Sequence, residues 1–385
     1  MIIEIRKAGF TNKGAEMMLL SIIDRIKTSF PNATIAMAPT TEKGSQPYSK
    51  LSRLGIKLKF RLRRGRFDIS WIGNIIPSKI REAYGIVLNK DIDVILDASG
   101  FSYSDQWGTY DTTELKDVLT KDKPSGQKFI FLPQAFGPFE NKVNKDNITK
   151  CINSADLIFA RDSHSMKSLN QLPINEPSKI IQSPDFTCGL GKSINKSVEE
   201  KSGKIAIVPN YRMLDKTDAS SSTSYVDFLT VAVKEVLANN LVPYFLIHET
   251  DLDRAVAEKV ISEVGRDIEI VEEENPKLIK GYLSVSKFVI SSRYHASVSA
   301  LCQSVPVIGT SWSHKYKELF REYDFDEGLI DVSKQERIKK VIDNLSDNEY
   351  RDRISLKLNK HSEVVKEQNS LMWDKVFEVI KTTVN

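Results

Sequence analysis

The chain has 385 residues, of which 41% are hydrophobic and 28% charged, with a formal net charge of +4. This length predicts two domains, and so mild a charge does not favour a nucleic-acid partner. No run of about 18 apolar residues occurs, so we expect no transmembrane helix. The N-terminus lacks a signal-peptide pattern. Three dispersed cysteines without zinc spacing predict a reducing cytoplasm and no disulfide framework.

The first half of the chain alternates between short apolar runs and amphipathic segments. Apolar residues recur at helical spacing from Leu19 to Phe30, which predicts a helix. We expect strands at residues 2–5, 34–38, 94–96, 129–132, 157–159 and 180–181. Short apolar strands separated by helices are typical of a parallel sheet that is covered on both faces.

A polar segment at residues 191–203 is the best candidate for a linker, and the alternation restarts after it. We expect strands at 205–208, 244–247, 268–271 and 287–291, with helices at 224–239, from 251, and at 277–283. The sequence therefore predicts two α/β domains, at residues 1–190 and 204–345. A charged helical tail at 346–385 is expected to pack back on the first domain.

The segment from Lys57 to Arg66 alternates cations with apolar residues at a period of two. One interpretation is a half-exposed strand with a basic face. The other is a surface that contacts anionic lipid headgroups or a diphosphate-linked acceptor at the inner leaflet of the membrane.

Polar clusters follow several strands of the first domain, where α/β proteins bind ligands. Gly9–Gly14 joins the first strand to the first helix, and Asn12 within it is a candidate ligand contact. The loop from Asp97 to Asp105 is polar and aromatic, which suits recognition of sugar hydroxyls, with both carboxylates as candidates. Arg161 is either one partner of a salt bridge or an anion clamp. For each cluster, a purely structural role is the alternative.

In the second domain, His248 and Glu249 follow a predicted strand and resemble an acid/base pair. Adjacent residues on a strand point in opposite directions, so we expect only one of them to face a ligand.

Residues 287–316 carry the strongest signal, a strand-turn-helix-strand unit with Arg293 and His295 at the start of its helix. A helix N-terminus favours anions, a guanidinium suits phosphate or carboxylate, and imidazole carries a proton near neutral pH. We expect one helix face to line the ligand site and another to pack in the core. The site face comprises Ser292, His295 and Ser299; the core face comprises Tyr294, Val298, Leu301 and Cys302.

The following strand ends at a second basic pair, His314 and Lys315, which we expect at the same sheet edge. The unit as a whole is predicted to hold a small anion and to move a proton beside it.

At these residues the chain resembles the polysaccharide pyruvyl transferase family. The similarity extends over nearly the whole chain, and its motifs are Gly9–Glu16 (GFTNKGAE), Phe159–Ser163 (FARDS), Pro184–Phe186 (PDF), Ser292–Leu301 (SRYHASVSAL) and Pro306–Tyr316 (PVIGTSWSHKY). The last two are the most specific.

The resemblance implies two Rossmann-like domains facing across a cleft, as in GT-B glycosyltransferases. It implies transfer of the enolpyruvyl unit of phosphoenolpyruvate onto two hydroxyls of a sugar, giving a pyruvate ketal and phosphate. It links His295, Arg293 and Arg161 to phosphoenolpyruvate. No metal cluster is evident in the sequence, and we expect no cofactor beyond this donor substrate, because the chemistry does not demand a metal. The acceptor is expected to be a galactose-type residue of a lipid-linked precursor of a capsule or exopolysaccharide.

In this scheme His295 protonates the enol carbon, while Arg161, Arg293 and Lys315 hold the anionic groups. The general base remains open among Asp97, Asp105 and Glu249. Two alternatives are a GT-B nucleotide-sugar glycosyltransferase, with Glu249 or Glu318 on the ribose, and a non-catalytic binding protein of the same fold.

Overall fold

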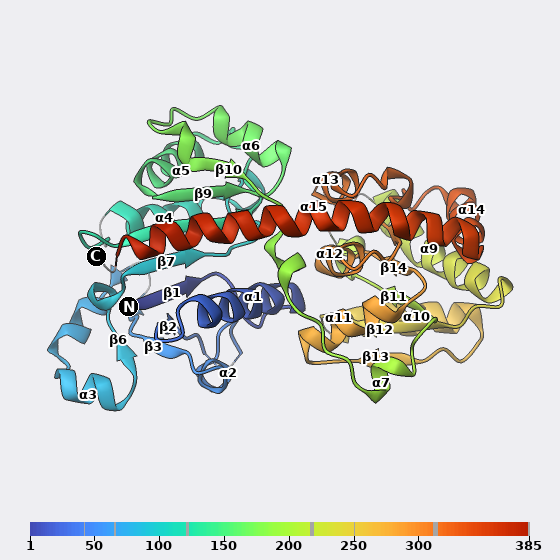
Figure 1. Ribbon diagram of the computed structural model, residues 1–385, viewed down its shortest axis with the longest axis horizontal. Helices are drawn as coiled ribbons and strands as arrows, with labels where there is room; N and C mark the ends of the chain where they lie inside the picture. The colour runs from blue at the N-terminus through green and yellow to red at the C-terminus, as the bar shows by residue number, and fades with distance from the viewer. Residues whose placement is uncertain are drawn as a thin grey trace. The chain divides into compact units, whose positions relative to one another are not determined.

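The protein is described by a computed structural model that covers residues 1–41, 43–64, 67–120, 123–215, 219–249, 251–310 and 315–383. It contains two compact α/β units, shown in Figure 1. Unit 1 comprises residues 1–11, 18–186 and 369–385, and unit 2 comprises residues 12–17 and 187–368. Two helices therefore contribute residues to both units, and each unit is considered by itself below.

Unit 1 is built on an eight-stranded sheet in the order β10-β9-β8-β7-β1-β2-β3-β6, with every pair of neighbours parallel. Its strands are β1 (Ile2–Arg6), β2 (Thr34–Met37), β3 (Lys57–Lys59), β6 (Ile86–Val87), β7 (Val94–Asp97), β8 (Lys128–Gln134), β9 (Leu157–Ala160) and β10 (Ile180–Gln182). The chain runs outward from β1 to β6, then returns to β7 on the other side of β1. The carboxyl ends of β1 and β7 thus form a topological switch point, where open α/β sheets bind ligands.

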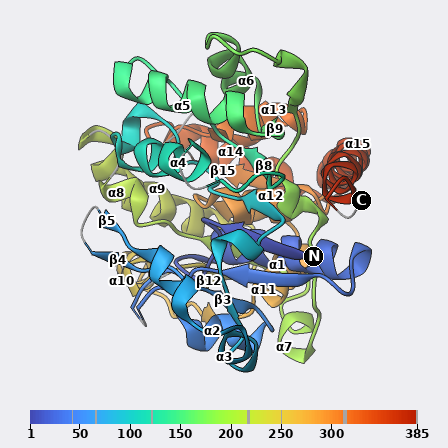
Figure 2. The same ribbon diagram turned by 90° about the vertical axis from the view of Figure 1, so that its left-hand side faces the viewer.

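The helices of unit 1 lie on both faces of its sheet (Figure 2). They are α1 (Lys13–Ser29), α2 (Tyr48–Arg53), α3 (Ser78–Ala83), α4 (Tyr110–Thr120), α5 (Lys142–Ser154), α6 (Ser163–Asn170) and the last part of α15 (Asn348–Lys381). Leu115 of α4 and Ile148 of α5 pack on Phe131 of β8 in one core cluster. Phe30, just beyond α1, meets Phe377 of α15 edge to face, with ring centroids 5.5 Å apart. A short antiparallel hairpin, β4 (Arg63–Arg64) with β5 (Phe67–Asp68), lies outside the main sheet.

Unit 2 has a five-stranded parallel sheet in the order β13-β12-β11-β14-β15. Its strands are β11 (Ile205–Val208), β12 (Pro243–Ile247), β13 (Ile270–Glu272), β14 (Val289–Ser291) and β15 (Val307–Gly309). Its helices are α7 (Lys196–Glu199), α8 (Arg212–Asp215), α9 (Ala219–Ala238), α10 (Asp251–Val264), α11 (Pro276–Val285), α12 (Tyr294–Leu301), α13 (Lys315–Glu322), α14 (Gln335–Ser346) and the first part of α15. The strand order reverses between β11 and β14, so a second switch point lies at their carboxyl ends.

The structure confirms the α/β class and the predicted strands, with small changes at their ends. The strand expected at residues 268–271 is found at Ile270–Glu272. The polar segment 191–203 contains the short helix α7, which buries Val198. No helix in the described part of the chain is both long enough and apolar enough to span a membrane.

The basic segment differs most from expectation, because two of its cations point into unit 1. Lys59 is buried and donates to Glu4 at 2.5 Å, and Arg61 pairs with Glu114. Leu62, by contrast, is 42% exposed. The prediction of a basic outer face is wrong for Lys59 and Arg61, because buried carboxylates draw their charges inward. Arg66 lies outside the described residues.

Candidate active site

The switch point of unit 2 joins the ends of β11 and β14 through direct hydrogen bonds. The backbone N–H of Ser292 donates to the carbonyl of Val208 at 3.1 Å. The side-chain amide of Asn210 donates to the carbonyl of Ser292 at 2.8 Å. These bonds fix the turn that leads from β14 into α12, and therefore fix where the first residues of α12 lie.

Ser292 is a structural centre of this turn. Its Oγ accepts from the hydroxyl of Tyr225 at 2.8 Å and shares a hydrogen bond of 2.8 Å with Thr310. Its carbonyl also accepts from the hydroxyl of Tyr316 at 2.7 Å. Ser292 is buried, so these contacts indicate that it holds the turn in shape. They do not support the prediction that it binds substrate.

Arg293 occupies the N-cap position of α12, and two carboxylates face its guanidinium. Its Nη2 lies 2.6 Å from both Oδ1 and Oδ2 of Asp253, and its Nε lies 3.1 Å from Oδ2. Glu249 forms a further ion pair with it. Burial lowers the pKa of Arg293 to about 10. Arg293 is thus a fixed cation with acidic partners, of which Asp253 was not predicted.

His295 is the second residue of α12, and its side chain is partly exposed. Its ring meets Tyr294 edge to face, with centroids 5.4 Å apart. The segment 12–17 packs against it in unit 2. A Cβ atom added to Gly14 would lie 2.8 Å from Cγ and Cε1 of His295, so this close approach requires glycine. The glycine-containing loop is therefore more than a simple turn between β1 and α1.

Asn12 caps the first turn of α1 within this segment. Its side-chain oxygen accepts from the backbone N–H of Ala15 at 2.8 Å, as N-cap residues do. Lys13 donates to the carbonyl of Glu274 at 2.6 Å and so connects the segment to the loop before α11 within unit 2. Asn12 therefore has a structural role as the N-cap of α1. Its contact with a ligand remains a prediction.

His248 and Glu249 both follow the end of β12 at Ile247. They lie outside the strand, so the alternation of side chains along a strand does not decide which of them faces a ligand. Glu249 pairs with Arg293. His248 is buried, and its Nε2 has no hydrogen-bond partner among the described residues. Burial, then the nearby charges of Arg293, His295 and Lys13, lower the pKa of His248 well below its usual value. A neutral imidazole therefore lies close to the charged groups of the site.

Lys315 is the remaining described residue that was predicted at the same edge of the unit 2 sheet as Arg293 and His295. Its Nζ lies 5.1 Å from the ring centroid of Tyr294 and 5.8 Å from that of Tyr316, within the range of cation–π attraction. His314, predicted beside it, lies outside the described residues.

The predicted core face of α12 is confirmed, since Tyr294, Val298, Leu301 and Cys302 are all buried. Its predicted site face is wrong in part. Ser299 is buried, and its hydroxyl contacts the sulfur of Met17. Only His295 on that face is partly exposed.

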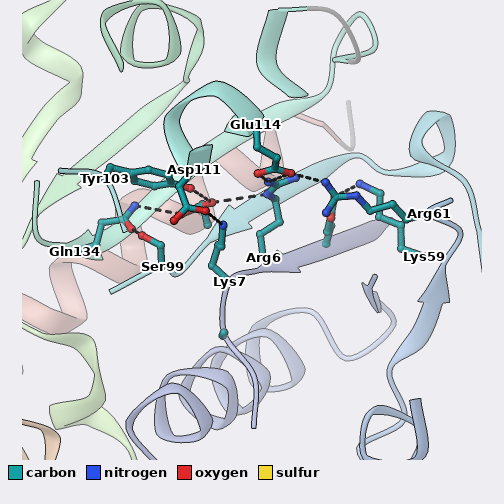
Figure 3. A network of polar contacts seen from close by, with 12 residues as sticks. Arg6, Lys7, Lys59, Arg61, Ser99, Tyr103, Asp111, Glu114 and Gln134 are labelled. Atoms are coloured by element: carbon teal, nitrogen blue, oxygen red, sulfur yellow. Dashed lines mark hydrogen bonds and ion pairs between the residues drawn. The ribbon is translucent and has the colours of Figure 1, made fainter. Parts of the chain in front are cut away.

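The switch point of unit 1 holds a second polar network, shown in Figure 3. It is formed largely by the last residues of parallel strands: Arg6 of β1, Lys59 of β3, Asp97 of β7 and Gln134 of β8. Arg6 donates to both oxygens of Glu114, at 3.0 and 2.8 Å. Opposite charges at buried strand ends thus compensate one another.

Asp97 lies inside this network and has no exposed surface. It accepts from the hydroxyl of Tyr103 at 2.9 Å and from the amide of Gln134 at 3.3 Å. Its Oδ2 lies 3.7 Å from Nε of Arg6. Burial raises the pKa of Asp97. The structure therefore gives it a supporting role and does not support its prediction as a residue that touches substrate.

Two other predicted residues of unit 1 also have structural partners. Asp105 accepts from the backbone of Glu140 and Asn141 and from the side chain of Asn144, at 2.6, 3.0 and 2.7 Å. Its carboxylate thus holds its loop to the start of α5. Arg161 forms a buried ion pair with Asp185 at 3.1 Å, which favours the salt-bridge interpretation.

Sequence reasoning missed the network of Figure 3, although a signal for it was present. Glu4 and Arg6 lie on the same face of β1, the central strand of a sheet covered by helices. Charged residues at such positions need buried partners. The two charges on β1 therefore predict that a network exists, but they do not identify Lys59, Arg61 or Glu114 as the partners.

The chain thus has a two-unit α/β fold of the GT-B class. The chain belongs to the polysaccharide pyruvyl transferase family, whose model matches residues 12–314. Among curated proteins, none matches the chain significantly in sequence.

Solved structures resemble the whole chain in fold at low sequence identity. S. aureus MnaA, solved with UDP, shares 13% identity, with a TM-score of 0.61 over 100% of this chain and 96% of that one. Anabaena Alr3699/HepE, solved with UDP-glucose, shares 10% identity, with a TM-score of 0.58 over 99% of each chain. A Rickettsia africae glycosyltransferase shares 14% identity, with a TM-score of 0.57 over 100% and 98%.

Proposed function

We propose that the protein transfers the enolpyruvyl unit of phosphoenolpyruvate onto two hydroxyls of a sugar to form a cyclic pyruvate ketal. The observation that carries the proposal is the family match over residues 12–314, which includes the segment that positions His295. The proposed acceptor is a galactose-type residue of a lipid-linked precursor of a surface polysaccharide. Phosphoenolpyruvate is the donor substrate, and the proposal requires no cofactor or metal. We place the reaction in the cytoplasm, with peripheral membrane contact as part of the proposal.

In the proposed mechanism, His295 acts as the general acid on the donor. As imidazolium it donates a proton to the methylene carbon of phosphoenolpyruvate, which makes C2 electrophilic. A sugar hydroxyl attacks C2, the C–O bond to phosphate then breaks, and a second hydroxyl closes the ketal. Of the two hydroxyl protons released, one replaces the proton that became part of the methyl group, and the other leaves on phosphate.

Charges around His295 support binding of the anionic donor. Lys315 and the N-terminus of α12 provide positive potential, while Arg293 is fixed nearby by Asp253. Glu249 is our candidate for the base, because its side chain is 14% exposed and it lies at the same edge. Asp97 is fully buried and Asp105 is bonded to backbone N–H groups, so we set both aside, together with Arg161.

The direct test follows phosphate release by the purified protein with phosphoenolpyruvate and a pyranoside acceptor. We expect His295→Ala to lower kcat by about 10²–10⁴-fold with little change in thermal stability. His361→Ala, a substitution on α15, is the matched control and should retain activity. Full activity in His295→Ala would remove this residue from the mechanism.

The alternative is a nucleotide-sugar glycosyltransferase. The fold similarity to the Rickettsia glycosyltransferase is compatible with this function. Of the acidic residues considered for its ribose contact, Glu318 pairs with Arg321, whereas Glu249, our candidate base, does not distinguish the two functions. Thermal shifts separate the two functions. Stabilisation by phosphoenolpyruvate but not by UDP or GDP supports pyruvyl transfer, and the reverse supports the glycosyltransferase.

A further inference from the structure

Two pockets adjoin the polar network at the switch point of unit 1. The first, here called the Tyr110 pocket, has a volume of about 290 Å³ and is lined by Lys7, Thr40, Gln46 and Tyr110 among others. The second, the Trp71 pocket, has a volume of about 310 Å³ and is lined by Trp71, Asn74, Asn89 and Lys90 among others. Both volumes lie at the lower end of the range for small-ligand sites, about 300–1,000 Å³.

The two pockets are neighbours, because Arg6 and Arg61 line both of them. Glu114 holds these two guanidinium groups together by accepting from each. The shared wall is therefore a salt-bridged cluster that both pockets contact. A ligand of two linked rings can place one ring in each pocket and cross this wall.

The charges of the network are balanced, which bears on the kind of ligand. Four cations are paired with four carboxylates: Arg6 and Arg61 with Glu114, Lys59 with Glu4, Lys7 with Asp111, and Arg6 also with Asp97. Only Lys90, an exposed residue at the Trp71 pocket, adds a cation among the described lining residues. A site for phosphate or a nucleotide needs an excess of donors, whereas this cluster presents donors and acceptors side by side.

Hydroxyl groups both donate and accept hydrogen bonds, so a wall of alternating guanidinium and carboxylate groups matches a sugar. Each pocket also carries one strongly exposed aromatic residue. Trp71 is 64% exposed and Tyr110 is 71% exposed. An aromatic ring with a polar tip can pack on the C–H face of a pyranose while its surroundings bind the hydroxyls.

We propose that the Tyr110 and Trp71 pockets together bind a neutral saccharide of at least two rings, with Trp71 stacking on the ring farther from Tyr110. The inference rests on the proposed function, since it identifies the acceptor as an oligosaccharide rather than a single sugar. It concerns unit 1 alone and requires no donor to be bound.

Binding without phosphoenolpyruvate tests the inference directly. The full-length protein is titrated with methyl β-galactoside and with a panel of neutral disaccharides (lactose, galactobiose, cellobiose and chitobiose), with binding followed by saturation-transfer NMR and calorimetry. We expect at least one disaccharide to bind about tenfold tighter than the monosaccharide, the gain that one stacked aromatic ring supplies. Failure of every disaccharide to bind would overturn the inference.

Two variants locate the binding. Trp71→Ala should remove the tenfold gain and leave monosaccharide binding unchanged, whereas Tyr110→Ala should weaken both. Tyr84→Ala is the matched control, because Tyr84 is also 71% exposed but is not among the residues that line either pocket. An unchanged ratio of the two affinities in Trp71→Ala would contradict the proposal.

Phosphate release separates this inference from the proposed function. Disaccharide binding that depends on Trp71, without phosphate release from phosphoenolpyruvate, supports the saccharide site and refutes pyruvyl transfer. Phosphate release that is equally fast with monosaccharide and disaccharide supports pyruvyl transfer and refutes the two-ring site.

Discussion

The two switch points have the same topology but different chemistry. In unit 1, the ends of β1 and β7 carry Arg6 and Asp97, and each charge within the network has an opposite partner. In unit 2, the ends of β11 and β14 lead to Arg293 and His295, beside a neutral, buried His248. Parallel sheets therefore supply the location of both sites, and the side chains at the strand ends determine what each can do.

This difference suggests a division of tasks within the proposed reaction. A balanced network offers hydrogen bonds to hydroxyl groups without attracting a strong anion, as a sugar acceptor needs. A partly exposed histidine beside a helix N-terminus suits an anionic donor that must receive a proton. Three predictions test how much the charge clusters of the two units stabilise the fold and whether Gly14 positions His295. They begin with the largest expected effect.

Removing the guanidinium from the switch point of unit 2 should be the most damaging change. Arg293→Ala leaves the carboxylates of Asp253 and Glu249 without their cation, and Asp253 has no exposed surface. We expect the free energy of unfolding to fall by about 3–5 kcal/mol. Urea unfolding measures this loss.

Two further variants show whether the buried charge causes the loss. Arg293→Ala combined with Asp253→Asn should recover part of the stability, because the uncompensated carboxylate is gone. Arg254→Ala, which breaks exposed ion pairs with Glu258 and Glu272 on the same unit, should have a far smaller effect. Equal losses in Arg293→Ala and Arg254→Ala would show that the Arg293 cluster does not stabilise unit 2.

We expect the polar network of unit 1 to make the free energy of unfolding depend on pH in the acidic range. Burial opposes ionisation of Glu114, but the charges of Arg6, Arg61 and Lys7 outweigh it and lower the pKa of Glu114 from 4.5 to about 2. A depressed carboxyl pKa stabilises the fold above the unfolded-state value and loses that contribution as the pH falls from about 4.5 to 2. The shift corresponds to about 3 kcal/mol at neutral pH.

Unfolding of the wild type and of Glu114→Gln between pH 7 and pH 2.5 measures this contribution. The variant should be less stable by about 3 kcal/mol at pH 7, and the difference should shrink as the pH falls. Glu82→Gln, an exposed position on α3, serves as control and should follow the wild type at every pH. A difference that is constant with pH would mean that Glu114 is not held ionised by its neighbours.

Sequence reasoning found the sheets and the His295 segment because both depend on local patterns. Apolar runs and helical spacing predicted the strands and the core face of α12. It did not find that Asp253 and Glu249 share Arg293, or that Glu4 draws Lys59 inward, since these partners lie 40, 44 and 55 positions apart in the chain. Long-range pairing of charges depends on packing, which a local pattern does not encode.

The contact between Gly14 and His295 gives the last and smallest expected effect. A Cβ atom at residue 14 would overlap the imidazole ring, with Cγ and Cε1 at 2.8 Å, so Gly14→Ala must displace His295. Because a shift of about 1 Å at a reacting group costs up to about 100-fold in rate, we expect kcat to fall by tenfold or more. Phosphate release under saturating phosphoenolpyruvate measures kcat and separates this effect from weaker binding.

Gly191→Ala is the matched control, because a Cβ atom there meets nothing within 4 Å. It carries the same change in backbone freedom without touching the imidazole, so its kcat should equal that of the wild type. A shifted His295 should also alter the pH profile of kcat in Gly14→Ala, since the environment of the proton donor changes. Unchanged kcat and pH profile in Gly14→Ala would show that the glycine serves only the turn, and that the position of His295 does not depend on residues 12–17.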